Sequence, residues 1–236
     1  MGSTQSTGGT ETSIWQDVPS ILAAAHELKS PLVLIRQLTF QLGEDDETVR
    51  RIRLTAERSL QLVESLTKVS RLEDALFESE PIYIPALYDE IAHELTPLVR
   101  ALDQKLEIHV PRTPITVVGN RGLLRSVIVG LCDNALTHND ISMPIELRAT
   151  RIGDRVLAGV RDYGPHTGHL KSMKQSLGKT PSPVSSRPRS SGLGLMIAEQ
   201  FARHMDAELH MRRHQTRGIT LSLSLPASQQ LSLLSV

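Results

Sequence analysis

Aromatic residues are scarce in this sequence of 236 residues, where Phe, Tyr and Trp together make up only 3%. Hydrophobic residues as a whole reach 39%, so the chain is able to form a sizeable core that aliphatic side chains must fill. The only cysteine is Cys132, which excludes an intramolecular disulfide bond. A single cysteine fits a reducing compartment, and we therefore expect a cytoplasmic protein.

An excess of either charge is also missing, because 26 Lys and Arg residues balance 26 Asp and Glu residues. This balance provides no general attraction to nucleic acid or to an anionic membrane, so we predict no nucleic-acid partner. No apolar run approaches the roughly 20 residues that span a bilayer, and no signal peptide is visible. Residues 1–13 are rich in Gly, Ser and Thr and are expected to form a flexible leader.

Apolar residues recur with a heptad spacing in the first helix that we predict, from about Ile14 to Leu42. The two series of heptad positions are Val18, Ala25, Leu32 and Thr39, and Ile21, Leu28, Ile35 and Leu42. All of these except Thr39 are apolar, so this side of the helix is expected to face a partner helix.

His26 follows one of these heptad positions and should therefore point into solvent. A buried core histidine is the alternative, but it conflicts with this phase. Glu27 can fix the imidazole tautomer and leave the other nitrogen free as a nucleophile, while Ser30 lies one turn further on the same face. Pro31 removes a helical hydrogen bond close to the histidine, a cost that indicates a functional bend.

A second helix is predicted from Glu47 to about Leu76, with apolar residues at spacings of three and four. Gly43 ends the first helix and Asp45 or Asp46 caps the second. Such a short connection makes the two helices antiparallel. One hairpin over residues 14–78 has a narrow core, so we expect two copies to form a homodimeric four-helix bundle.

The remaining residues, 79–226, predict an α/β module, followed by a tail at 227–236. The polar stretch 165–191 is too long for an ordinary loop and suits a mobile lid. The elements that we expect are strands at 81–85, 105–110, 116–118, 145–151, 155–161, 208–213 and 219–225, and helices after Pro85, after Asn120 (its N-cap) and from Gly192.

The segment from His26 to Leu32, His-Glu-Leu-Lys-Ser-Pro-Leu, resembles the phospho-acceptor box of sensor histidine kinases, whose usual form is His-Glu-Leu-Arg-Thr-Pro-Leu. The resemblance implies that His26 is the residue that becomes phosphorylated. It also implies that Glu27 positions the imidazole. Ser30, at the place where the family often has Thr or Asn, is expected to support weak phosphatase activity.

Three segments of the α/β module resemble the ATP-binding Bergerat (GHKL ATPase) fold of the same family. They are Asp133-Asn134-Ala135, Asp162-Tyr163-Gly164-Pro165, and the glycine-rich start of a helix from Ser191 to Ala198; Gly218 then precedes the last strand. The resemblance implies that Asn134 ligates the Mg²⁺ of Mg-ATP, that Asp162 accepts a hydrogen bond from adenine, and that Gly164 lets the base approach. It also implies that Gly192 and Gly194 hold phosphate oxygens, as a helix N-terminus can.

Several positions depart from the usual form of these nucleotide-binding segments. Gly130 stands where the family has a second Asn, and Thr137 and His138 stand where it has a Lys and an aromatic residue. His166 and Ser190 replace two of its glycines, and Ile219 replaces its final Thr or Ser. Only Asn134, Asp162, Gly164, Gly192 and Gly194 are therefore carried over. Gly130 offers no side-chain oxygen to the metal, which predicts weaker Mg-ATP binding rather than none.

Two other pairs of histidines, His166 with His169 and His210 with His214, invite a metal-binding interpretation. The first pair falls in the polar stretch, and the second falls in a predicted strand, where we expect both rings on one face. Neither pair has Cys or carboxylate partners at ligand spacing, which favours solvated surface over a metal site.

We therefore interpret the sequence as that of an ATP-dependent protein-histidine kinase. It would phosphorylate its own His26 and transfer the phosphoryl group to an aspartate of a response regulator receiver domain. One alternative is a dimeric scaffold or phosphotransfer protein with a degenerate nucleotide fold; a mechanical ATPase is a second, but it leaves the histidine hairpin without a role. A membrane sensor of which this chain is a fragment would also fit. The input signal, the regulator and whether transfer occurs within or between subunits are not encoded in any motif.

Overall fold

A computed structural model of the chain describes residues 18–42, 46–69, 78–164 and 193–228. The expected leader, the polar stretch 165–191 with His166 and His169, Gly192, and residues 229–236 of the tail lie outside these ranges. Within the described residues, no helix is long and apolar enough to cross a membrane.

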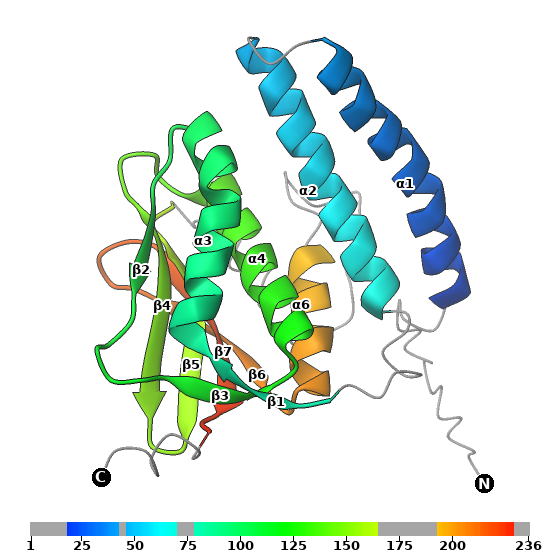
Figure 1. Cartoon of the computed structure of the whole chain (residues 1–236). Coiled ribbons are helices and arrows are strands. Elements are labelled where there is room, and N and C mark those ends of the chain that lie inside the picture. Colours follow the sequence, from blue (N-terminus) through cyan, green and yellow to red (C-terminus); the bar gives the residue numbers. More distant parts are fainter. Residues whose placement is uncertain (1–17, 43–45, 70–77, 165–192, 229–236) are drawn as a thin grey trace, which may run out of the picture.

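The first two helices are α1 (Val18–Gln41) and α2 (Glu47–Val69), which lie side by side as a hairpin (Figure 1). The backbone N–H of Thr48 donates to Asp46 Oδ1 at 2.7 Å, so Asp46 caps α2 as predicted. The α-helix continues through Pro31. The predicted ends at Ile14 and Leu76, together with Gly43 and Asp45, fall outside the described residues.

Only one of the two heptad series of α1 faces α2. Ala25 and Thr39 are buried, whereas Leu28, Ile35 and Leu42 of the other series are 52%, 41% and 70% exposed. The residues of α2 that are buried are Val49, Arg53, Ala56, Leu60, Val63, Leu66 and Val69. A single hairpin therefore satisfies half of the predicted apolar side and leaves the other half at the surface.

The α/β module begins with β1 (Glu80–Tyr83) and α3 (Ile84–Ala101). The sequence prediction was wrong at this junction, because Ile84 and Pro85 belong to the helix and not to the strand. Proline is well accommodated in the first turn of a helix, where its missing N–H has no helical partner. The elements that follow are β2 (Leu106–His109), β3 (Thr116–Gly119), α4 (Arg121–His138), β4 (Ile145–Ile152), β5 (Arg155–Asp162), α6 (Leu193–His204), β6 (Glu208–Arg213) and β7 (Ile219–Pro226).

The main sheet has five strands in the order β2-β4-β5-β7-β6, and β1 pairs separately with β3. Strand β2 is parallel to β4, and the other neighbours are antiparallel. Helices α3, α4 and α6 cover one face of this sheet (Figure 1). The sequence of β7 shows why, because apolar Ile219, Leu221 and Leu223 alternate with Thr220 and Ser222, which puts one apolar face toward the helices.

The hairpin packs directly on the α/β module. Ala25, Val63, Leu66 and Val69 belong to the same cluster of buried side chains as the core of the module. Helix α2 contacts α3 and α6, so it lies between α1 and the module (Figure 1). The described residues therefore form three layers: the sheet, the helices α3, α4 and α6, and the hairpin.

Candidate functional site

His26 lies on α1 with an exposed side chain, which confirms the predicted outward phase and excludes the buried alternative. Glu27 and Ser30 are exposed as well. All three side chains are thus accessible on the same helix as the exposed apolar series. The ring of His26 is therefore available to a reacting group that approaches from outside the hairpin.

Helix α4 carries Gly130 and Asn134 one turn apart. The side chain of Asn120 accepts a hydrogen bond from the Leu123 N–H at 2.9 Å, which confirms Asn120 as the N-cap. Asn134 is half-buried. A Cβ atom built on Gly130 meets nothing within 4 Å, so there is free space on this face of the helix beside Asn134.

Asp162 lies buried at the end of β5, where its Oδ1 accepts a hydrogen bond from the Gly164 N–H at 3.0 Å. Gly218, which begins the approach to β7, has a positive φ of 82°, and a Cβ atom there would lie 1.9 Å from the Asp162 carbonyl oxygen. Only glycine permits this approach of two backbones. The turn before β7 is thereby held against the strand end that presents Asp162.

Ile219 is paired directly with Asp162 across β5 and β7 and is fully buried. An isoleucine in this register places a hydrocarbon, rather than a hydroxyl, next to the strand end that carries the carboxylate. This departure in the sequence therefore falls at the very strand pair on which Asp162 lies.

Asn139, which the sequence analysis did not single out, connects α4 with the end of β5. Its Oδ1 accepts the N–H of Tyr163 at 2.8 Å, and its Nδ2 donates to the Met143 carbonyl at 2.7 Å. The end of the Asn134 helix is thereby fastened to the segment that contains Asp162 and Gly164. An Asn at a helix end is a common cap, so its sequence position alone carries no sign of this link.

Tyr163 is fixed on the side of the sheet that faces away from the helices. Its hydroxyl donates to Glu146 at 2.6 Å, and the Arg161 guanidinium lies 4.3 Å from the centre of its ring. Burial by itself would raise the pKa of Glu146, but the hydrogen bonds from Tyr163 and Arg148 and the charges of Arg148 and Arg161 hold it below its ordinary value. These contacts further restrain the strand end at Asp162.

Gly194 lies in the first turn of α6 and lines a small cavity of about 90 Å³ together with Gly130 and Asp133. The structure therefore brings the α4 and α6 parts of the predicted nucleotide site together. His26, Asn134 and Asp162 do not line this cavity. Its opposite wall is formed by α2, with Gln61, Leu62, Glu64, Ser65 and Lys68.

Asp133 is bound by Arg58 of α2, a contact that sequence reasoning missed. The Arg58 Nε lies 2.8 Å from Asp133 Oδ1, as an ion pair rather than a well-aligned hydrogen bond, and its guanidinium donates to the Asp133 carbonyl at 3.0 Å. Burial raises the pKa of Asp133, and the charge of Arg58 opposes that rise. The two residues are 75 positions apart, and no local pattern links them.

The described histidines do not form a metal site. His210 lies in β6, 3.5 Å from Glu208, whereas His214 lies beyond the end of β6 and contacts the Thr220 hydroxyl at 2.7 Å. The expectation that both rings share one strand was therefore wrong, because β6 ends at Arg213. No group of three or more His, Cys, Asp or Glu residues that could hold a metal ion is found among the described residues.

Comparison with known proteins connects this geometry to a family. Residues 119–229 match the family model described as histidine kinase-, DNA gyrase B-, and HSP90-like ATPase. The chain is 30% identical to the sensor protein CreC of Escherichia coli over 212 residues, which are 87% of this chain and 44% of CreC. It is also 30% identical to the sensor protein SphS of Synechococcus elongatus over 225 residues, 88% of this chain and 54% of SphS. The chain thus spans about half the length of the curated relatives it matches.

Solved structures show the same fold. Full-length ShkA in complex with AMPPNP superposes with a TM-score of 0.64 at 18% identity, over 89% of this chain and 46% of ShkA. The histidine kinase AdeS of Acinetobacter baumannii superposes with a TM-score of 0.57 at 18% identity, over 86% of this chain and 98% of that structure. The α/β module therefore has the GHKL-type ATPase fold that the sequence predicted.

Proposed function

We propose that the chain is the kinase core of a sensor histidine kinase, because residues 119–229 match the model of the histidine kinase-, DNA gyrase B-, and HSP90-like ATPase family. It transfers the γ-phosphoryl group of ATP to its own His26 and then to an aspartate of a response regulator. The observation that carries the proposal is an exposed histidine on a helical hairpin that is packed against an ATPase module of this family. We assign residues 14–78 to the phospho-acceptor hairpin and 79–226 to the ATP-binding domain.

His26 is the nucleophile in this proposal. A neutral imidazole nitrogen attacks the γ-phosphorus, the P–N bond forms as the bond to the leaving ADP oxygen breaks, and the ring proton passes to Glu27 or to water. Glu27 is adjacent in sequence and is also exposed, so its carboxylate can fix the tautomer and stabilise the positive ring. Ser30 lies one turn away. In a separate phosphatase reaction, its hydroxyl orients water toward the phosphoaspartate of the regulator.

The nucleotide binds, in this proposal, where α4, the end of β5 and the start of α6 meet. Buried Asp162 accepts a hydrogen bond from the adenine amino group, and Gly164 leaves room for the base. Gly192 and Gly194 hold phosphate oxygens at the start of α6.

Magnesium fits beside Asn134 on the face of α4 that also carries Gly130. The amide oxygen of Asn134 is a suitable hard ligand, and the space at Gly130 has room for water where a side-chain oxygen is lacking. When bound, the ion would neutralise charge on the transferring phosphoryl group. Asn134 itself serves to hold the ion and to orient the phosphates toward the acceptor.

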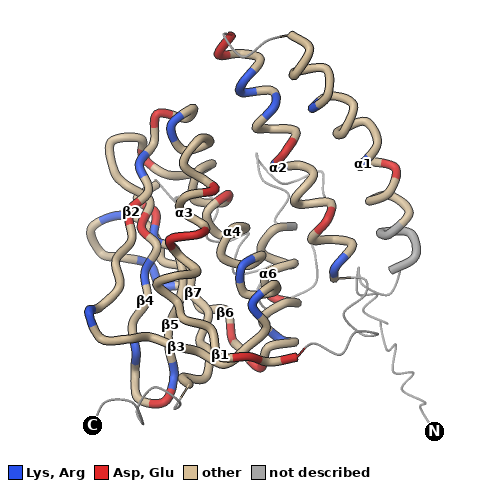
Figure 2. Tube along the Cα trace, in the orientation of Figure 1, with Lys and Arg blue, Asp and Glu red and all other residues tan. Residues whose placement is uncertain are grey.

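A homodimer follows from the exposed series on α1. Leu28, Ile35 and Leu42 are all more than two-fifths exposed, and α1 carries few charges along its length (Figure 2). Pairing two hairpins buries this apolar series and produces a four-helix bundle. Two copies of the chain therefore complete the apolar side that one hairpin leaves open.

A scaffold with a degenerate nucleotide fold is the second candidate. Its support is Ile219 beside Asp162, Gly130 in place of a second ligand, and a cavity at α4 and α6 of only about 90 Å³. Such a protein would bind a regulator through the hairpin without using ATP.

Calorimetric titration with a non-hydrolysable ATP analogue, with and without Mg²⁺, distinguishes the two candidates. We expect Mg²⁺-dependent binding that Asn134→Ala nearly abolishes and that Gly130→Asn strengthens, because Asn adds a ligand oxygen. Absence of binding by the parent chain at every accessible concentration would favour the scaffold. Strong binding that Gly130→Asn leaves unchanged would show that the metal is placed wrongly.

A further inference from the structure

We propose that α2 is an intramolecular inhibitor of the nucleotide site: it lies on the groove between α4 and α6, competes with ATP for that groove, and is fastened there by the Arg58–Asp133 pair. This inference rests on the proposed function, because it takes the groove as the phosphate side of the ATP site. What it adds is a regulatory role for the face of α2 that points away from α1.

The size of the cavity is the first argument. With α2 in place, Gly130 of α4 and Gly194 of α6 face a volume of about 90 Å³. Sites for small molecules usually measure roughly 300–1,000 Å³. Leu62 of α2 and Ile197 and Ala198 of α6 line the cavity, so both helices contribute apolar side chains to it. The groove becomes large enough for phosphates when α2 moves away.

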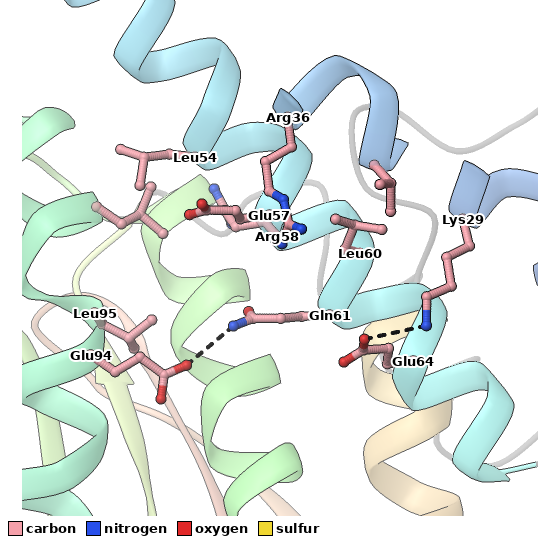
Figure 3. Close-up of a pocket in the computed structure, with 12 residues that line it drawn as sticks. Lys29, Arg36, Leu54, Glu57, Arg58, Leu60, Gln61, Glu64, Glu94 and Leu95 are labelled. Carbon is pink, nitrogen blue, oxygen red and sulfur yellow. Dashed lines mark hydrogen bonds and ion pairs between the residues drawn. The ribbon is translucent and has the colours of Figure 1, made fainter. Parts of the chain in front are cut away.

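The polar contacts of α2 are the second argument. Arg58 pairs with Asp133, Gln61 Nε2 donates to Glu94 at 3.1 Å, and Lys68 Nζ donates to the Ser126 hydroxyl at 3.5 Å. Figure 3 shows Gln61 reaching across from α2 to Glu94 on α3. These contacts recur along α2 at spacings of three and seven residues, on the one face that α2 turns toward the module.

The charges in the cavity are the third argument. Glu64 of α2 and Asp133 of α4 both line it, and carboxylates disfavour a triphosphate. The lining also holds two basic residues, Lys68 and Arg125, and Arg125 pairs with Glu90 and Glu94. Two acidic and two basic residues balance, so the docked arrangement offers a triphosphate no net positive charge.

The Arg58–Asp133 ion pair is weak enough for a binding ligand to displace α2. The side chains of Arg58 and Asp133 keep 27% and 26% of their surface exposed, and ion pairs with access to water contribute modestly. When only the released fraction of a protein can bind, the apparent affinity falls in proportion to that fraction. Weakening the Arg58–Asp133 pair should therefore strengthen nucleotide binding, although Arg58 itself is not part of the proposed nucleotide site.

The first test replaces Arg58 by methionine, which keeps an unbranched aliphatic stem but removes the guanidinium charge and its donors. Arg51→Met is the matched control, because Arg51 lies on the same helix but lines the separate groove between α1 and α2. Binding of a fluorescent ATP analogue with Mg²⁺ should become about fivefold tighter in Arg58→Met, the factor that follows from losing about 1 kcal/mol. It should be unchanged in Arg51→Met. Equal affinity in both variants and the parent would overturn the proposal.

The second test holds α2 in place. In the double variant Lys68→Cys with Ser126→Cys, a short bis-maleimide should join α2 to α4, while native Cys132 is fully buried and stays unmodified. We expect the cross-linked protein to lose nucleotide binding, and the reagent to have no such effect on Lys68→Cys alone. Undiminished binding after cross-linking contradicts the inhibitor role but leaves the ATP site intact. If the parent and Arg58→Met both fail to bind any nucleotide, the proposed ATP site is wrong, and the competition falls with it.

Discussion

Replacing Gly130 by alanine should stabilise the protein. Gly130 lies in the middle of α4, far from both ends of the helix at Arg121 and His138. A Cβ atom built on it meets no other atom within 4 Å, so the methyl group has room and creates no strain. The substitution therefore acts almost entirely through the conformational freedom that glycine loses when it enters a helix.

The expected gain is about 1 kcal/mol in the free energy of unfolding, the difference between glycine and alanine in the interior of a helix. For a chain of this size, that gain corresponds to a rise of about 2–4 °C in Tm. Gly159→Ala provides a control of opposite sign, because its Cβ atom would lie 2.0 Å from the Leu221 carbonyl oxygen and 2.5 Å from the Ser222 Cα. Such overlap with backbone atoms should lower stability by about 1–3 kcal/mol.

Thermal unfolding followed by far-UV circular dichroism, which reports on secondary structure, measures both variants side by side. We expect Gly130→Ala to have a higher Tm than the parent and Gly159→Ala to have a lower one. A fall in Tm for Gly130→Ala would refute the reasoning, because it would mean that the space beside Gly130 is filled or that residue 130 is not helical.

Three further substitutions test the hairpin and the sheet. His26→Gln should abolish phosphorylation by labelled ATP while leaving helicity and dimerisation as in the parent, since the side chain is exposed; labelling that persists would remove His26 from the mechanism. Ser30→Ala should reduce dephosphorylation of the regulator without changing phosphorylation of His26, and an unchanged dephosphorylation rate would exclude Ser30. Burial, followed by the charges of Arg161 and Arg212, lowers the pKa of His214, so the folded protein binds this proton less readily than the unfolded chain. The stability that neutral His214 contributes is therefore present above about pH 6.5, the pKa of the unfolded chain, and is lost as the pH falls toward the lower pKa of the folded state. His214→Gln should lessen the decline in urea midpoint between about pH 7.5 and about pH 5.5, and an equal decline in both proteins would contradict this role.

Local patterns in the sequence were sufficient for most helices and strands. The heptad spacing predicted α1 and the outward position of His26, and Asn120 marked the start of α4, because both signals act over a few residues. The junction at Ile84 and Pro85 was wrong for a local reason as well. Alternating apolar residues and prolines are compatible with a strand, and only the packing of Ile84 in the core decides for the helix.

Contacts between distant parts of the chain were beyond the reach of sequence patterns. The spacing of α1 could not tell which apolar series faces α2 and which stays at the surface. The Arg58–Asp133 pair depends on how the hairpin lies on the module, and the link from Asn139 to Tyr163 depends on where β5 ends. Each of these contacts is set by tertiary packing, which no single-helix or single-strand period encodes.

The most direct test of the account is to incubate the purified protein with ATP labelled at the γ-phosphate and to treat the product with acid and with alkali. The proposed mechanism predicts a label on His26 as a phosphoimidazole, which acid removes and alkali leaves in place. A label that survives acid, or a protein that binds Mg-ATP yet takes up no label, would contradict it.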